Sequence, residues 1–99
     1  MATERKVAIV TGAASGLGRA MALGLVESGM DVVAVDRNAT ALAAMAPAAA
    51  GAPASVLPLR ADLMQPDAFD RIVATTLEKF GRIDVLINNA GIGQASVRR

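Results

Sequence analysis

Three glycines lie close together near the start of the chain, in a segment that reads TGAASGLG from Thr11 to Gly18. A short apolar run precedes this segment and a stretch with helical periodicity follows it, so the glycines are expected between a strand and a helix. The N-terminus of a helix offers free backbone N–H groups and a positive dipole end, and glycine lets the backbone approach a ligand without a Cβ in the way. The pattern therefore predicts a site for the pyrophosphate of a dinucleotide. Its expected binding residues are Gly12, Ser15, Gly16, Leu17 and Gly18.

Two other kinds of glycine-rich turn fit the sequence less well. The phosphate loop of nucleoside triphosphatases is excluded, because no Gly-Lys-Ser or Gly-Lys-Thr follows the glycines. A methyltransferase turn is disfavoured by the spacing of Gly12, Gly16 and Gly18. An ordinary strand-to-helix turn, in which Ser15 serves only as the helix cap, stays open as an alternative.

A single acid, Asp36, ends the next apolar run, about 20 residues after the glycine segment. A carboxylate at the end of this strand can accept hydrogen bonds from both hydroxyls of an adenosine ribose. It would repel a 2′-phosphate at close range by up to about 4 kcal/mol under an effective dielectric of about 20. Asp36 therefore predicts NAD as the preferred cofactor over NADP, and Arg37 beside it offsets part of the repulsion. An acid that is merely solvated at a strand end is the alternative.

The elements that must position these residues alternate along the chain. Apolar runs predict strands at Lys6–Thr11, Asp31–Val35, Ser55–Arg60 and Ile83–Ile87, and helical patterns predict helices at Gly16–Ser28, Asn38–Ala46 and from Gln65-Pro66 to Phe80. Strands that alternate with helices indicate an α/β fold with a parallel sheet covered on both faces. We therefore expect a doubly wound sheet of the Rossmann type, partial here, with four strands and three helices.

Local signals predict details of these elements. The first helix is expected to pack through Leu17, Met21 and Leu25, which recur every four residues. Pro47 is expected to end the second helix, and Pro66 to occupy the first position of the third. The first strand shows no alternation of polar and apolar residues, which predicts a central strand buried on both faces.

The composition argues against several classes of function. The net charge is +1 and no basic or acidic block occurs, which disfavours nucleic-acid and membrane partners. The chain has no Cys and no His, which disfavours disulfides and a metal site. Residues 1–99 are expected to form one domain, and prolines break the longest uncharged run, Ala41–Leu59, so that it cannot span a membrane. Charged residues at positions 4–6 disfavour a signal peptide, and a cytoplasmic location is expected.

Four sequence elements together resemble the successive fingerprints of the short-chain dehydrogenase/reductase family. They are the glycine segment at 11–18, Asp36, the pair Asp62-Leu63 after the third strand, and Asn88-Asn89-Ala90-Gly91 after the fourth. They stand in the order that the family shows, and the resemblance extends from Lys6 to Gly93. It implies the strand order 3-2-1-4 and a homo-oligomeric parent enzyme.

The resemblance also implies roles for the last two elements. Asp62 would hydrogen-bond the adenine amine, and Leu63 would contribute a backbone contact. The segment that follows the fourth strand would steady the sheet and line the floor beneath the nicotinamide ribose, with Asn89, Ala90 and Gly91 as cofactor-binding residues. A polar loop residue at position 62 and turn-forming asparagines at 88 and 89 are the alternatives.

Catalytic residues of the family are missing from the sequence. The family transfers hydride between a nicotinamide ring and an alcohol or carbonyl, and it uses a serine with a Tyr-x-x-x-Lys pair beyond the Asn-Asn-Ala-Gly segment. The chain contains no Tyr, and neither His nor Cys is present to replace it as a general acid or base. The resemblance thus implies a dinucleotide-binding N-terminal part of an NAD(P)-dependent oxidoreductase, truncated before the catalytic region that recognises a small-molecule substrate.

Two other hypotheses stay open beside this one. The chain could be a non-catalytic module that binds NAD, or a truncated product without a function. In the resemblance, a further strand would pair with the outer edge of the fourth strand, and an uncovered aliphatic edge is an aggregation hazard. We therefore expect the isolated 99 residues to be marginally stable.

Overall fold

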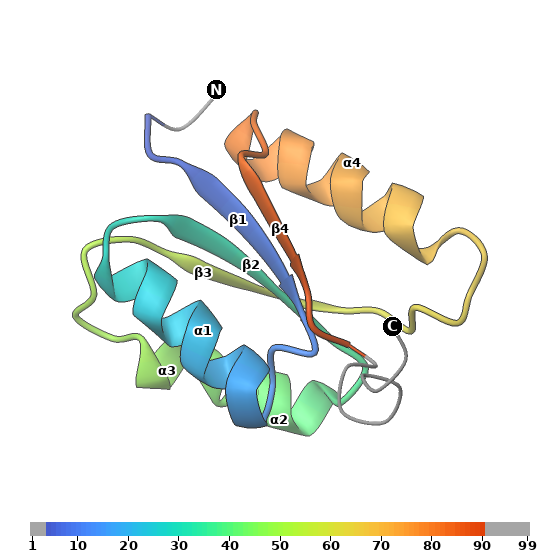
Figure 1. Ribbon diagram of the computed structural model, residues 1–99, viewed down its shortest axis with the longest axis horizontal. Helices are drawn as coiled ribbons and strands as arrows, with labels where there is room; N and C mark the ends of the chain where they lie inside the picture. Colours follow the sequence, from blue (N-terminus) through green and yellow to red (C-terminus); the bar gives the residue numbers. More distant parts are fainter. Residues whose placement is uncertain (1–3, 91–99) are drawn as a thin grey trace.

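A computed structural model describes residues 4–90 of the chain. The strands are β1 (Val7–Thr11), β2 (Asp31–Asp36), β3 (Val56–Arg60) and β4 (Val85–Asn88), and the helices are α1 (Gly16–Glu27), α2 (Ala39–Ala43), α3 (Met45–Ala48) and α4 (Ala68–Phe80). The strands form one parallel sheet in the order β3-β2-β1-β4. Helices α1, α2 and α3 lie on one side of the sheet and α4 on the other (Figure 1). The predicted α/β fold, strand order and partial Rossmann sheet are confirmed.

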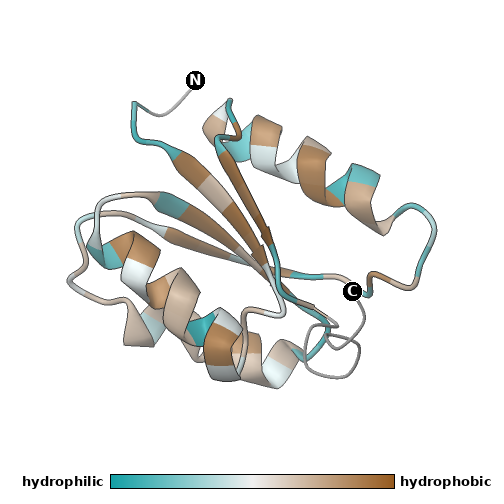
Figure 2. Ribbon diagram, in the orientation of Figure 1, coloured by the Kyte–Doolittle hydropathy of each residue, from teal (hydrophilic) through white to brown (hydrophobic). Residues whose placement is uncertain are grey.

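Strand β1 is the centre of the sheet, and all five of its residues are buried, as predicted. Its side chains alternate between the two faces: Ala8 and Val10 belong to the apolar cluster beneath α1 to α3, whereas Val7 and Ile9 belong to the cluster beneath α4. Figure 2 shows the hydrophobic colouring along β1 and β4. Because the strands are parallel, the carboxyl ends of β1, β2 and β4 meet at one edge of the sheet.

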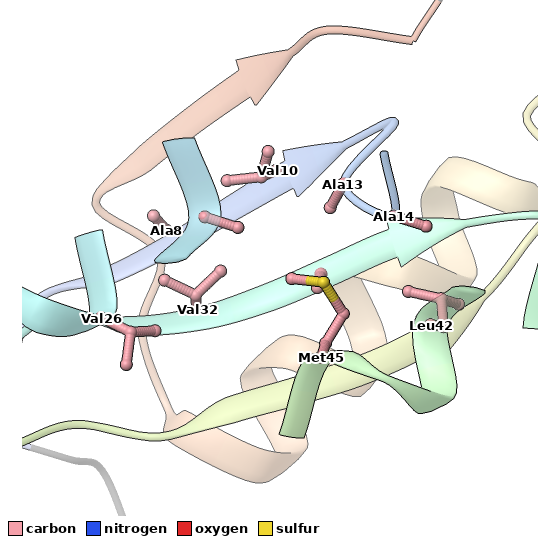
Figure 3. Close-up of a cluster of buried hydrophobic side chains, with 10 residues drawn as sticks. Ala8, Val10, Ala13, Ala14, Val26, Val32, Leu42 and Met45 are labelled. Carbon is pink, nitrogen blue, oxygen red and sulfur yellow. The ribbon is translucent and has the colours of Figure 1, made fainter. Parts of the chain in front are cut away.

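Helix α1 packs through a face that only partly overlaps the predicted one: of the predicted residues, Leu25 packs against the apolar cluster, and Met21 is only half-buried. Its buried residues are Gly18, Ala22 and Val26, while Leu17 is 65% exposed. The absence of a side chain at Gly18 lets the helix backbone lie close to the turn at Gly12, and this close approach decides the orientation. Figure 3 shows the cluster on this side of the sheet, in which Val26 lies together with Val32.

The helix predicted from Asn38 to Ala46 is divided into α2 and α3, which meet at Ala44. The Asn38 side chain caps α2 by accepting a hydrogen bond from the N–H of Ala41 at 3.0 Å. Pro47 does not end the helix as expected; it lies in the first turn of α3, where its missing N–H removes no intrahelical hydrogen bond.

Helix α4 begins at Ala68, so Pro66 lies before the helix and not at its first position. The helix buries Ile72, Thr76 and Phe80 against the second face of the sheet. It ends at Gly81, which adopts the left-handed conformation with φ 78°, and this confirms the predicted end.

The two outer strands differ slightly from expectation. Strand β3 is an edge strand, which explains why it accommodates Pro58 opposite Ala34 of β2. Strand β4 begins at Val85 and not at Ile83, and within residues 4–90 it pairs on one side only, with β1. Its Leu86 is 46% exposed. The marginal stability of the isolated chain stays a prediction.

A carboxylate holds β1 and β4 together at their amino ends. Asp84 accepts hydrogen bonds from the N–H of Val7 and from Nε of Arg82, each at 2.8 Å, and pairs with Nη2 of Arg82 at 2.8 Å. The hydrogen bonds from the Arg82 guanidinium, followed by that from the Val7 N–H, hold the pKa of Asp84 below its usual range.

We expect the Asp84→Asn variant to be less stable than the unaltered chain at neutral pH and to lose less stability in acid. A carboxylate whose pKa is lower in the folded state stabilises the fold above its unfolded pKa, and this contribution disappears as the pH falls through the folded value. The effect is measured by comparing the urea midpoints of unfolding of the variant and the unaltered chain, first near neutral pH and then well below about pH 3.9. Asp67→Asn is the control, because the Asp67 side chain makes no capping hydrogen bond. Equal acid sensitivity of Asp84→Asn and the unaltered chain would contradict the prediction.

Candidate functional site

A cavity of about 480 Å³ opens at the carboxyl edge of the sheet. It is lined by Gly12, Val35, Asp36, Arg37, Asp62, Leu63, Met64, Asn88 and Ala90. In parallel α/β sheets, ligands bind in the crevice outside the carboxyl ends of the strands. Residues from all four of the predicted sequence elements are therefore brought together around one cavity, at the edge where such sheets bind ligands.

The glycine segment forms a turn whose shape depends on the absence of side chains. Gly12 and Gly16 have φ of 64° and 56°, in the left-handed region that favours glycine. A Cβ on Gly18 would overlap the carbonyl oxygen of Gly12, because α1 crosses directly over the turn. A Cβ on Gly16 would meet no atom within 4 Å, so this glycine faces open space.

The N-terminus of α1 is open to a ligand. Ser15 occupies the N-cap position in an extended conformation, yet its side chain makes no capping hydrogen bond. The first turn contains no acidic residue. The first N–H groups of a helix have no intrahelical partner, so this terminus combines available donors with a positive dipole end. Leu17, also predicted as a binding residue, is exposed in the same turn.

Asp36 connects the end of β2 with the glycine turn. Its Oδ2 accepts a hydrogen bond from the N–H of Ala14 at 3.0 Å, and its Oδ1 accepts one from the N–H of Asn38 at 3.0 Å. One backbone hydrogen bond, from the N–H of Ala13 to the carbonyl of Val35 at 3.0 Å, runs beside this contact. The carboxylate is only partly buried and lines the cavity.

The loop after β3 contributes Asp62, Leu63 and Met64 to the lining of the cavity. Asp62 Oδ1 accepts a hydrogen bond from the N–H of Met64 at 2.9 Å, which orients the carboxylate within its own loop. Leu63 packs against the apolar cluster beneath α4. Met64 lines the cavity although its side chain is 84% exposed.

The segment after β4 is tied to the end of β1 by side-chain hydrogen bonds. The hydroxyl of the buried Thr11 donates to Asn88 Oδ1 at 2.8 Å and accepts from the N–H of Ala90 at 3.1 Å. Asn89 Nδ2 donates to the carbonyl oxygen of Gly12 at 3.2 Å. These contacts join segments 77 positions apart and hold the turn against β4. Gly91, the last predicted binding residue, lies outside the described residues.

The sequence matches a protein family over almost its whole length. The family described as short chain dehydrogenase matches residues 6–99. The chain belongs to the short-chain dehydrogenase family. Among curated relatives, it is 40% identical to a 3-oxoacyl-[acyl-carrier-protein] reductase of Thermotoga maritima over 92 residues, which are 93% of this chain and 37% of the relative. It is 41% identical to a 3beta-hydroxysteroid dehydrogenase of Mediterraneibacter gnavus, covering 94% of this chain and 34% of the relative. The chain thus spans little more than a third of these relatives.

Solved structures of the short-chain dehydrogenase family share the fold. The L-sorbose reductase of Gluconobacter frateurii, solved with NADPH and L-sorbose, superposes with a TM-score of 0.82 and 34% identity, covering 91% of this chain and 35% of that chain. An actinorhodin polyketide ketoreductase solved with NADPH superposes with a TM-score of 0.80 and 35% identity, covering 92% and 35% of the two chains. Both matched proteins were solved with a nicotinamide dinucleotide.

Sequence reasoning named most of the cavity lining but missed two residues. Val35 is a buried strand residue at the end of β2, and only the three-dimensional arrangement shows that it reaches the cavity wall. Met64 directly follows the Asp62-Leu63 pair, and its position in that loop was the available signal. In the described part of the chain, no helix combines the length and apolar character of a membrane span.

Proposed function

We propose that the chain is the cofactor-binding portion of an NAD(P)-dependent oxidoreductase and binds a nicotinamide dinucleotide at the carboxyl edge of the sheet. The observation that carries this proposal is the position of the open N-terminus of α1, which follows directly from the turn that lines the cavity. An anionic group at the helix terminus and a nucleoside in the cavity would be neighbours, as they are in a dinucleotide.

Each part of the cofactor has a matching group of residues. The pyrophosphate would lie against the turn and the helix terminus, at Gly12, Ser15, Gly16, Leu17 and Gly18. The adenosine would occupy the cavity, with its ribose at Asp36 and its adenine at Asp62 and Leu63. The nicotinamide ribose would lie over Asn89, Ala90 and Gly91. When bound, the nicotinamide ring of the cofactor donates or accepts hydride, and the residues of this chain hold and orient the molecule.

We further propose that NAD is preferred over NADP. Asp36 supports the preference, because its carboxylate lies in the cavity and would oppose a 2′-phosphate. Arg37 lines the same cavity and would reduce this repulsion. The two solved relatives named above contain NADPH, so the proposed preference for NAD rests on Asp36 of this chain and not on those relatives.

The chemical step is proposed for the longer parent enzyme. No Tyr is present in the chain, and the catalytic serine and Tyr-x-x-x-Lys pair of the family would follow it. The substrate would be a small alcohol or carbonyl compound, and the names of the relatives cover an acyl-carrier-protein conjugate, a steroid and a sugar. A cytoplasmic location and self-association of the parent enzyme belong to the same proposal.

Calorimetric titration of the 99-residue chain with NAD tests the proposal, and we expect saturable binding. The Gly16→Ala variant should bind NAD at least about tenfold more weakly, because a Cβ would stand in the open space where the pyrophosphate approaches. Gly51→Ala is the matched control, since Gly51 also has a positive φ and also faces open space. Absence of binding would argue against a dinucleotide site and in favour of a truncated product without function. Equal loss in both variants would argue against a pyrophosphate site at Gly16.

A further inference from the structure

The carboxylate of Asp36 is engaged by the backbone of the protein itself. Its two oxygens accept hydrogen bonds from two backbone N–H groups, those of Ala14 and Asn38, both at 3.0 Å. Ala14 is 6% exposed, so water has little access to its N–H, whereas Asn38 is exposed. A buried donor without a partner is costly, and an exposed one can turn to water. Of the two hydrogen bonds, only the one to Ala14 satisfies a donor that water could not satisfy in place of Asp36.

Ala14 lies in the middle of the phosphate-facing turn. The turn is flanked by two glycines with positive φ, Gly12 and Gly16, and α1 begins at the second. The hydrogen bonds made by residues 13 and 14 to the end of β2 tether the backbone between these glycines. The tether at 14 fixes the backbone directly before Ser15, the N-cap of α1.

We propose that Asp36 is a positioning residue for the glycine turn, in addition to any contact that it makes with a ribose. The inference rests on the proposed function in one respect, because the turn is taken to be the pyrophosphate site. Asp36 then acts on two parts of the cofactor: it meets the ribose directly and places the pyrophosphate donors through Ala14. Removal of the side chain should weaken binding of NAD through both contacts, whereas for NADP the loss of positioning should offset part of the gain from removing the charge.

Two substitutions separate positioning from charge. Asp36→Asn and Asp36→Ala both remove the negative charge, but the asparagine keeps one carbonyl oxygen that can accept from Ala14, while the N–H of Asn38 turns to water. If Asp36 acted through its charge alone, the two variants would bind NADP equally. If it positions the turn, the asparagine variant should bind NADP about tenfold more tightly than the alanine variant.

Amide hydrogen exchange of the ligand-free chain, followed by NMR, provides a readout that needs no cofactor. Exchange at Ala14 should be about tenfold faster in Asp36→Ala than in Asp36→Asn. The amide of Ile9, in the buried centre of β1, serves as the internal reference for global unfolding. Asp62→Ala is the control substitution, because within residues 4–90 the Asp62 carboxylate accepts a hydrogen bond from its own loop and not from the glycine turn, so exchange at Ala14 should be unchanged.

The exchange and binding measurements together support or overturn the positioning role of Asp36. Selective acceleration at Ala14, together with the tighter NADP binding of the asparagine variant, supports it. Equal exchange at Ala14 in the two variants overturns it, and so does acceleration that is matched at Ile9. If the unaltered chain binds neither cofactor, the proposed function fails, and the exchange measurement still decides whether Asp36 positions the turn.

Discussion

Replacing Gly18 with alanine should unfold the chain or bring it close to unfolding. The added Cβ would overlap the carbonyl oxygen of Gly12 and press on Asn89 Nδ2, and the first of these atoms belongs to the backbone. To make room, α1 would have to move away from the sheet and loosen the packing of Ala22 and Val26. We expect a loss of about 3 kcal/mol or more, from a total stability of roughly 5–15 kcal/mol for a domain.

The same helix supplies a matched control for this substitution. Gly24 is exposed in α1, and a Cβ there would meet no atom within 4 Å. Gly24→Ala should therefore stabilise the chain by about 0.5–1 kcal/mol, the helix propensity difference between the two residues. Urea denaturation followed by circular dichroism measures both changes. A shift of the same sign in the two variants would show that the close approach of α1 to Gly12 is not what requires a glycine.

The second large effect is expected in the choice between NAD and NADP. We expect the unaltered chain to bind NAD more tightly than NADP by about two decades, because a 2′-phosphate beside Asp36 meets a repulsion of up to about 4 kcal/mol. Asp36→Ala should narrow this difference, and Arg37→Ala should widen it. Calorimetric dissociation constants for both cofactors measure the ratio, and added salt should reduce it by screening.

Either of two results would overturn this interpretation of Asp36. If the unaltered chain bound NADP more tightly than NAD, the carboxylate would not control the choice. An unchanged ratio in Asp36→Ala would lead to the same conclusion. The ratio of the two constants is the quantity to compare, because the loss of turn positioning in Asp36→Ala weakens both cofactors together.

The central elements of the fold could be predicted because their sequence pattern follows directly from burial. Strand β1 and most of β2 are buried on both faces, so each appears as an uninterrupted apolar run. The end of α4 could also be predicted from the sequence, because Gly81 provides the left-handed residue that ends a helix. Strand order came from the resemblance to a family and could not be derived from the runs themselves.

Other features depend on contacts between distant residues. The face through which α1 packs is decided by the lack of space at Gly18, whereas hydrophobicity alone favours Leu17. The division of α2 from α3 and the late start of α4 after Pro66 are local boundaries that periodicity does not resolve.

The candidate site shows the same division. Its motifs are contiguous in sequence and were predicted with their residues. The hydrogen bonds that join them were not, because they connect groups far apart in the sequence: the Thr11 hydroxyl with the Asn88 side chain, and the backbone N–H of Ala14 with the Asp36 carboxylate. A sequence pattern indicates which residues belong to a site, but the pairing of the strands determines which of these residues form hydrogen bonds with each other.

The sheet order also affects how the chain is made. Strand β1 pairs on one side with β2 and on the other with β4, whose residues follow 77 positions later. At a synthesis rate of about 5–20 residues per second, one side of β1 waits roughly 4–15 seconds for its partner. During this interval the N–H and C=O groups on the unpaired edge of β1 can form hydrogen bonds with strands of other chains near the ribosome. A pause in translation between β2 and β4 would lengthen the interval, so the speed of synthesis over these codons bears on how much of the chain folds correctly.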